Sequence, residues 1–141
     1  MSSDKRLEEK QAYLDKLVKD RGYVLDYHKI LVKHDFDAMT SINQFLETVY
    51  LKDRALDRRT KELLSIFGLI QGRAARGQIQ SHMRVAVDLG VTPKELLELV
   101  ELVLPMSGFA TFQVGFSAWC DFFQVDGIEP TVARFEGGSP A

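Results

Sequence analysis

The stretch QIQSHMRVAVDLGVTPKE, residues 78–95, carries the pattern of one complete helix and the start of the next. If its first part is helical, Ile79, Met83, Ala86 and Leu89 recur at spacings of three and four and form one apolar stripe. Gly90 then suits the left-handed position at which helices commonly end. The stretch therefore predicts a helix, a short turn and a second helix.

The second helix has the clearest start signal in the chain. Thr92 can accept a hydrogen bond from the amide of Glu95, the Glu95 side chain can reach back, and Pro93 suits the first helical turn. Pro105 and Gly108 are expected to end or kink this helix.

Helical spacing continues in both directions, over residues 4–20, 23–33, 37–51 and 58–73, the last with Asp57 as a cap. A final helix is expected over residues 109–123, with aromatic side chains at spacings of three and four: Phe109, Phe112, Phe116, Trp119 and Phe123. No strand pattern of useful length is present, so the predicted fold is all-α. We expect a helical extension over residues 1–35, one domain over residues 36–125 and an irregular tail over residues 126–141.

Composition limits the functions that the chain can serve. A length of 141 residues with 45% hydrophobic and 27% charged residues is typical of one globular domain. The net charge of −2, and the lack of Lys or Arg within residues 109–123, argue against nucleic acid as a partner. The apolar runs 63–70 and 109–120 are too short to span a bilayer, residues 1–10 contain no apolar signal segment, and Cys120 is the single cysteine. These features predict a cytoplasmic protein without a membrane span.

The aromatic helix over residues 109–123 has more apolar surface than one small domain covers easily. A helix that is hydrophobic on most sides needs burial all round. Either it is the central core helix, or a second subunit covers it, and the two alternatives are about equally well supported by this argument.

His82 lies within the apolar stripe of its helix, and it is the first candidate for chemistry. An imidazole titrates near neutrality and can carry a proton wherever a substrate reaches it. The alternative is a packed His bonded to nearby backbone. The other histidines, His28 and His34, form no His-x-x-x-His pair, and no glycine-rich phosphate loop occurs, so neither a metal nor a nucleotide cofactor is expected. Ser81 adjoins His82 in sequence but faces another side of a helix, which disfavours serine chemistry.

Glu62 is the acid that could act with His82. Its helix should pack antiparallel to the His82 helix across the short region 72–77. Because Glu62 lies far from that connection, contact would require His82 to lie well along its own helix. Position alone favours a solvated Glu62, or an ion pair with Arg58 or Arg59.

Three segments together resemble the carboxymuconolactone decarboxylase family, which is related to alkyl hydroperoxidase D. They are Arg59-Thr60-Lys61-Glu62-Leu63-Leu64, then His82 with Ala86, Gly90-Val91-Thr92, Glu95-Leu96 and Glu98, then Pro105 with Gly108. The resemblance implies an all-helical homotrimer or homohexamer whose His-bearing helix lines a pocket near a subunit interface.

The resemblance also separates two chemistries. The peroxidase branch carries Cys-x-x-Cys-x-x-x-His, whereas the positions seven and four before His82 are Ala75 and Gln78. Dithiol chemistry needs an attacking and a resolving thiol, so the peroxidase alternative is disfavoured.

The branch without the cysteine pair implies a cofactor-free lyase or isomerase for a small carboxylated unsaturated lactone, or a related intermediate of aromatic catabolism. His82 would be the general acid or base, with Glu62 as its catalytic partner. The candidate substrate-binding residues are Arg73, Arg76, Arg84 and Trp119. A helical oligomer that binds a small acid without catalysis is the remaining alternative.

Overall fold

The computed structural model describes residues 3–126, and these residues form helices and turns without a strand. The predicted all-α fold is confirmed. The predicted tail over residues 126–141 lies outside the described residues, apart from Asp126.

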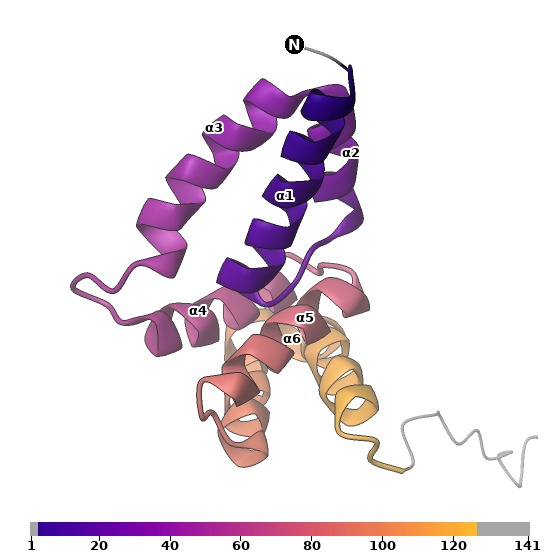
Figure 1. Ribbon diagram of the computed structural model, residues 1–141. Coiled ribbons are helices and arrows are strands. Elements are labelled where there is room, and N and C mark those ends of the chain that lie inside the picture. Colours follow the sequence, from indigo (N-terminus) through magenta and orange to yellow (C-terminus); the bar gives the residue numbers. More distant parts are fainter. Residues whose placement is uncertain (1–2, 127–141) are drawn as a thin grey trace, which may run out of the picture.

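The N-terminal half is a group of three helices (Figure 1), α1 (Ser3–Arg21), α2 (Asp26–His34) and α3 (Phe36–Leu46). Leu17, Val32 and Met39 are its buried core, with half-buried Tyr13 and Phe36 packed against them. This half was predicted as helices over residues 4–20, 23–33 and 37–51. The structure corrects two boundaries, because α2 begins at Asp26 and α3 gives way to a π-helical turn, η1 (Glu47–Leu51).

Those corrections move two tyrosines out of the α-helices in which the pattern placed them. Gly22 takes a left-handed backbone with φ of 87° directly after α1, so Tyr23 lies in the α1–α2 connection. Tyr50 lies in η1, and π-helical turns often occur at functional sites because they displace side chains from the regular helical register.

The C-terminal half consists of α4 (Arg58–Gln71), α5 (Arg76–Asp88) and α6 (Pro93–Phe122), which pack against one another. The caps predicted from sequence for α4 and α6 are confirmed, whereas α5 begins at Arg76, two residues before the stretch 78–95 from which its helix was predicted. The Asp57 side chain accepts from Thr60 N at 2.7 Å, and the Thr92 and Glu95 side chains form the reciprocal cap at the start of α6. The core of this half is built from residues of all three helices and the α5–α6 connection: Ile66, Ile70, Ile79, Met83, Ala86, Val91, Leu96, Val100, Val103 and Ala118.

Helix α6 is broken at Gly108, where φ is 81° and ψ is 176°, as the sequence predicted. Counted as one element, α6 is the single helix among the described residues that is long and apolar enough to cross a membrane. This differs from the expectation that no apolar run is long enough. The length arises from two segments joined at Gly108, each shorter than the roughly 20 residues that a straight span requires.

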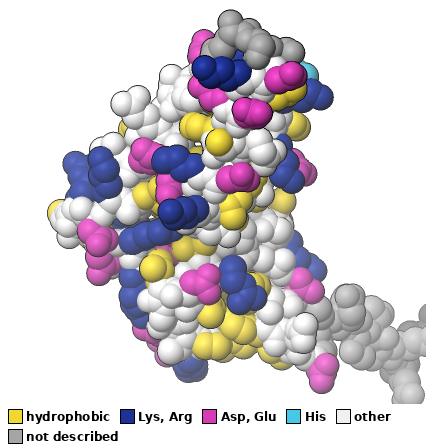
Figure 2. Space-filling view, viewed as in Figure 1, with side chains coloured by type: hydrophobic (Ala, Val, Ile, Leu, Met, Phe, Trp, Pro, Cys, Tyr) yellow, Lys and Arg dark blue, Asp and Glu magenta, His cyan; other side chains and the backbone are white. Residues whose placement is uncertain are grey.

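The second segment of α6 is only partly enclosed by its own chain. Thr111, Gly115 and Ala118 are buried, whereas Phe109 is 71% exposed. In the space-filling view, hydrophobic side chains gather over the α5 and α6 region, and charged side chains are spread over α1 to α3 (Figure 2). The second segment of α6 is therefore not fully enclosed by the described residues of its own chain.

Candidate active site

Glu62 and His82 meet at the junction of the two helical groups. His82 lies at the middle of α5, and its Nδ1 lies 2.6 Å from Glu62 Oε1. The Glu62 side chain is fully buried, and His82 is 8% exposed. The expectation of a solvated Glu62, or of an ion pair with Arg58 or Arg59, is wrong, because the central position of His82 in α5 brings it opposite Glu62 on the antiparallel α4.

Two tyrosines complete the hydrogen bonding of this pair. The Tyr50 hydroxyl donates to Glu62 Oε2 and lies 3.3 Å from His82 Nδ1. The Tyr23 hydroxyl lies 3.0 Å from His82 Nε2. Both rings also lie against the imidazole, with centroid distances of 5.7 Å for Tyr50 and 5.0 Å for Tyr23. The imidazole is thus held by a partner at each nitrogen.

This arrangement selects one tautomer of the neutral His82 ring. A carboxylate only accepts hydrogen bonds, so His82 Nδ1 carries the proton and donates a hydrogen bond to Glu62 Oε1. His82 Nε2 then has the free lone pair, which accepts from Tyr23. A carboxylate behind one ring nitrogen and a reactive second nitrogen is the arrangement of many general acid–base histidines.

Both tyrosines keep their hydroxyl protons at neutral pH. Burial, followed by the hydrogen bond to Glu62 and its charge, raises the pKa of Tyr50 far above its ordinary value. Burial is also the largest cause for Tyr23, whose pKa is raised to about 12. Each hydroxyl is therefore a donor, to Glu62 and to His82 respectively.

His82 opens on a cavity of about 570 Å³, which is the size of a small-molecule site. Its apolar wall contains Leu25, Leu46, Val49, Leu64 and Leu69. Its polar wall contains Arg21, Tyr23, Tyr50, Lys61, Ser65, Gln78 and His82. The charged groups of this lining are the cations Arg21 and Lys61, and no Asp or Glu is among the described residues that form it. The cavity therefore favours a small, partly apolar anion.

The four other candidates from the sequence lie elsewhere in the protomer. Arg73 and Arg76 are exposed around the α4–α5 connection, and the Arg84 guanidinium lies 4.7 Å from the ring centroid of Phe122. Trp119 donates from Nε1 to the Pro93 carbonyl at 2.9 Å. None of the four lines the cavity, and their substrate-binding role stays a prediction.

Sequence reasoning missed Arg21, Tyr23 and Tyr50. Tyr23 and Tyr50 were expected within helices over residues 23–33 and 37–51, and Arg21 fell just outside the helix expected over residues 4–20. One signal was available for Tyr23, because Gly22 is a glycine directly after a helical pattern and indicates a helix end there. No sequence signal indicated that the α1–α2 connection reaches His82.

The described residues give little support for thiol chemistry or for metal binding. Cys120 is buried and does not line the cavity, and burial raises the pKa of its thiol. Ala75 is the N-cap residue of α5, and Gln78 lines the cavity one turn before His82. Within residues 3–126, no group of three or more His, Cys, Asp or Glu side chains is arranged to hold a metal ion.

Comparison with known proteins identifies the family. The family model described as Carboxymuconolactone decarboxylase family matches residues 37–120, which is more than half of the chain and includes Glu62 and His82. The chain belongs to this family. No curated protein and no solved structure gives a match in the corresponding comparisons. The resemblance noted in the sequence is confirmed, and family membership agrees with the all-helical fold.

Proposed function

We propose that this family member is a cofactor-free, decarboxylase-like lyase for a small carboxylated unsaturated lactone, with His82 as its general acid. The observation that carries the proposal is the Glu62–His82 pair at the wall of a cavity lined by cations. A carboxylated ring compound suits both the apolar wall and the positive charge, and His82 lines the cavity that would hold it.

In the proposed reaction, the bond between the carboxylate carbon and the ring carbon breaks, and carbon dioxide leaves. The electron pair of that bond spreads into the conjugated lactone carbonyl, and the ring carbon then takes a proton from protonated His82 Nε2. The Glu62 carboxylate, behind Nδ1, offsets the positive charge of the imidazolium ring that supplies this proton. The Tyr23 hydroxyl, at 3.0 Å from Nε2, is placed to orient that nitrogen or to exchange its proton.

The test is carbon dioxide release from a panel of carboxylated γ-lactones and β-keto acids. His82→Gln keeps a hydrogen-bonding side chain of similar reach but cannot transfer the proton, so turnover should fall about 10²–10⁴-fold while the protein still folds and assembles. If the variant unfolds or dissociates while its folded fraction turns over normally, His82 is structural and the proposal fails.

Cys120→Ser separates this proposal from thiol peroxide reduction. Cys120 is 2% exposed and lies outside the cavity, so carbon dioxide release should be unchanged in the variant. A peroxidase activity of the wild type that disappears in Cys120→Ser would favour the thiol chemistry instead. A wild type that binds carboxylates but releases no carbon dioxide from any member of the panel would favour the non-catalytic oligomer.

A further inference from the structure

Arg21 is a buried cation that forms no ion pair within residues 3–126. It is the last residue of α1 and is 2% exposed. The ion pairs of the described residues do not include it. Its two side-chain contacts are with His28 and Asn43, of which Asn43 is a neutral amide. Burial, followed by the charge of Arg21, lowers the pKa of His28 to about 4, so His28 is also neutral near pH 7. A buried charge normally has a charged partner.

The hydrogen-bonding capacity of Arg21 is also only partly used. A neutral imidazole has one acceptor nitrogen, yet two N–H donors face the His28 ring. Leu25 N lies 2.9 Å from Nδ1, and Arg21 Nη1 lies 3.1 Å from Nε2. In addition, Arg21 Nε is buried without any acceptor among the described residues. At most two of the five guanidinium N–H groups therefore have protein acceptors, one of them at Asn43.

The nearby carboxylates are engaged by other groups. Glu47 accepts from Asn43 at 3.1 Å and from Lys16 at 2.9 Å. Glu62 accepts from His82 and Tyr50. The other charged residue of the cavity lining is a cation, Lys61, whose Nζ donates to the Lys52 carbonyl at 2.6 Å. The cavity therefore holds two cations, and neither is paired with an acid of the described chain.

We infer that the Arg21 guanidinium is the anion subsite of this cavity and receives a carboxylate of the bound acid. The inference rests on the proposed function only in taking that acid to be the substrate. A guanidinium can hold a carboxylate through two parallel N–H···O bonds, and a carboxylate in the cavity would supply the counter-ion that Arg21 lacks among the described residues. Because Tyr23 follows Arg21 by two residues and contacts His82 Nε2, the same short segment would position the anion and orient the acid–base group.

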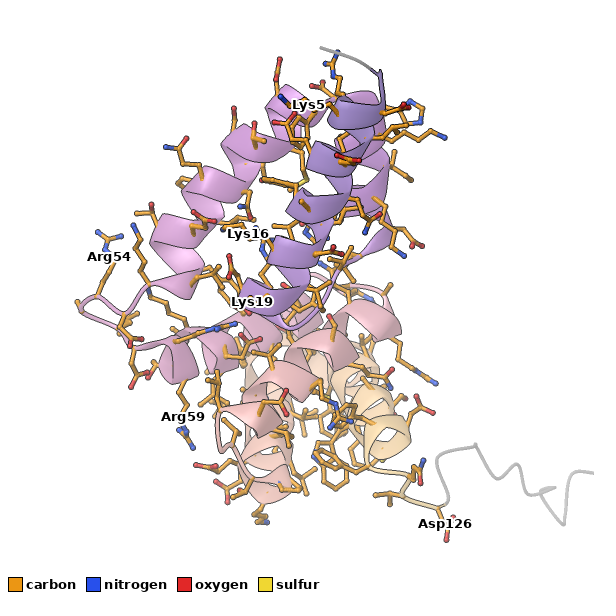
Figure 3. The ribbon with its side chains drawn as sticks, viewed as in Figure 1. Lys5, Lys16, Lys19, Arg54, Arg59 and Asp126 are labelled. Carbon is orange, nitrogen blue, oxygen red and sulfur yellow. The ribbon has the colours of Figure 1, made fainter. Side chains whose placement is uncertain are left out.

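Calorimetric binding measurements can test this subsite without turnover. The titrants are 2-furoate, a flat five-membered ring with one carboxylate, and 2-furamide, its uncharged counterpart. Wild type should prefer furoate. Arg21→Met should lower the furoate affinity about tenfold or more, the loss expected for a hydrogen bond between charged groups, and should leave furamide binding unchanged. Arg54→Gln is the matched control, because Arg54 is exposed and projects away from the protein between η1 and α4 (Figure 3).

Arg21→Lys keeps the charge but loses the planar fork, so its furoate affinity should fall between those of wild type and Arg21→Met. This variant preserves the test if Arg21→Met does not fold. Thermal melting adds a second readout. The melting temperature of ligand-free Arg21→Met and Arg21→Lys shows whether each variant is folded at the temperature of the titration, so that a loss of furoate affinity can be assigned to the lost guanidinium.

Three results would overturn the inference. They are equal affinity of wild type for furoate and furamide, furoate binding to Arg21→Met or Arg21→Lys as tight as to wild type, and tighter binding of inorganic phosphate than of furoate. Failure of the proposed function has a different signature. In that case His82→Gln keeps the turnover of wild type while the dependence of furoate binding on Arg21 is still observed.

Discussion

Replacing Glu62 by Gln tests the acid–base pair through the group that does not touch substrate. Glu62 is fully buried and accepts two hydrogen bonds, from His82 Nδ1 at 2.6 Å and from Tyr50. An amide of the same shape has one acceptor oxygen and a donating NH₂ group, so it cannot accept from both. If the NH₂ group faces His82, the ring must carry its proton on Nε2 instead of Nδ1. In that orientation the variant reverses the tautomer, and in either orientation it removes the charge that offsets the imidazolium ring.

The two consequences differ in size. The loss of one charge-assisted hydrogen bond costs stability at most about 1.5–3 kcal/mol, and removal of a buried charge offsets part of that cost. Turnover should fall about 10²–10⁴-fold, or roughly 3–5 kcal/mol of barrier, because the carboxylate charge that favours the proton-donating imidazolium form of His82 is then lost. Glu101→Gln is a matched control, since Glu101 is an exposed carboxylate on α6.

The measurement that needs no substrate is the imidazole ¹⁵N spectrum of His82. Wild type should show the neutral ring protonated at Nδ1, and Glu62→Gln should show protonation at Nε2 or a mixture of the two. Carbon dioxide release and the free energy of unfolding in urea complete the comparison. A Glu62→Gln protein that is folded, keeps the Nδ1 tautomer and turns over within threefold of wild type would refute the assigned role of Glu62.

Three further predictions follow from the described residues. His28 has a folded pKa of about 4 against an ordinary 6.5, so its stabilising contribution is complete above pH 6.5 and is lost as pH falls toward 4. This contribution amounts to about 3 kcal/mol. In urea titrations at decreasing pH, the free energy of unfolding of His28→Gln should fall less steeply than that of wild type. The exposed control His34→Gln should behave as wild type does. A Cβ on Gly115 would lie 2.7 Å from Ile70 Cδ1, so Gly115→Ala should destabilise the α4–α6 packing by about 1–3 kcal/mol, and an unchanged urea midpoint would contradict this. Wild type should sediment as an oligomer at micromolar concentration. Phe109→Glu should shift the protein toward monomer, because each large apolar side chain buried at an interface contributes roughly 1.5–3 kcal/mol. A monomeric wild type would remove the support for an interface over residues 109–123.

Local signals in the sequence predicted the C-terminal half well. The caps at Asp57 and Thr92 depend on contacts within one helical turn, and the break at Gly108 depends on a single residue that tolerates a positive φ. His82 was found because its place in an apolar stripe is a local property. Glu62 was found through the family resemblance, since helix packing alone placed it too far from His82.

Arg21 could not be found in the same way, because its importance depends on contacts between segments distant in sequence. A charge at the end of a charged helix is ordinarily solvated, and nothing in residues 3–21 shows that α2 and α3 bury this one. Tyr50 depends similarly on the π-helical turn, which replaces the regular helix that the pattern predicts over residues 37–51.

The site is divided between the part of the chain that the family match covers and the part that it does not. The match spans residues 37–120 and includes Glu62, His82 and Tyr50. Arg21, Tyr23 and Leu25 line the cavity from outside that range. Glu62 and His82 therefore lie within the family match, whereas Arg21, at the end of α1, and Tyr23, in the α1–α2 connection, lie outside it. In the proposed reaction, proton transfer depends on Glu62 and His82, and the anion is recognised by Arg21, so we expect residues 21–27 to determine which acid is accepted. Substitutions of Arg21 should change affinity and substrate preference before they change the protonation chemistry of His82.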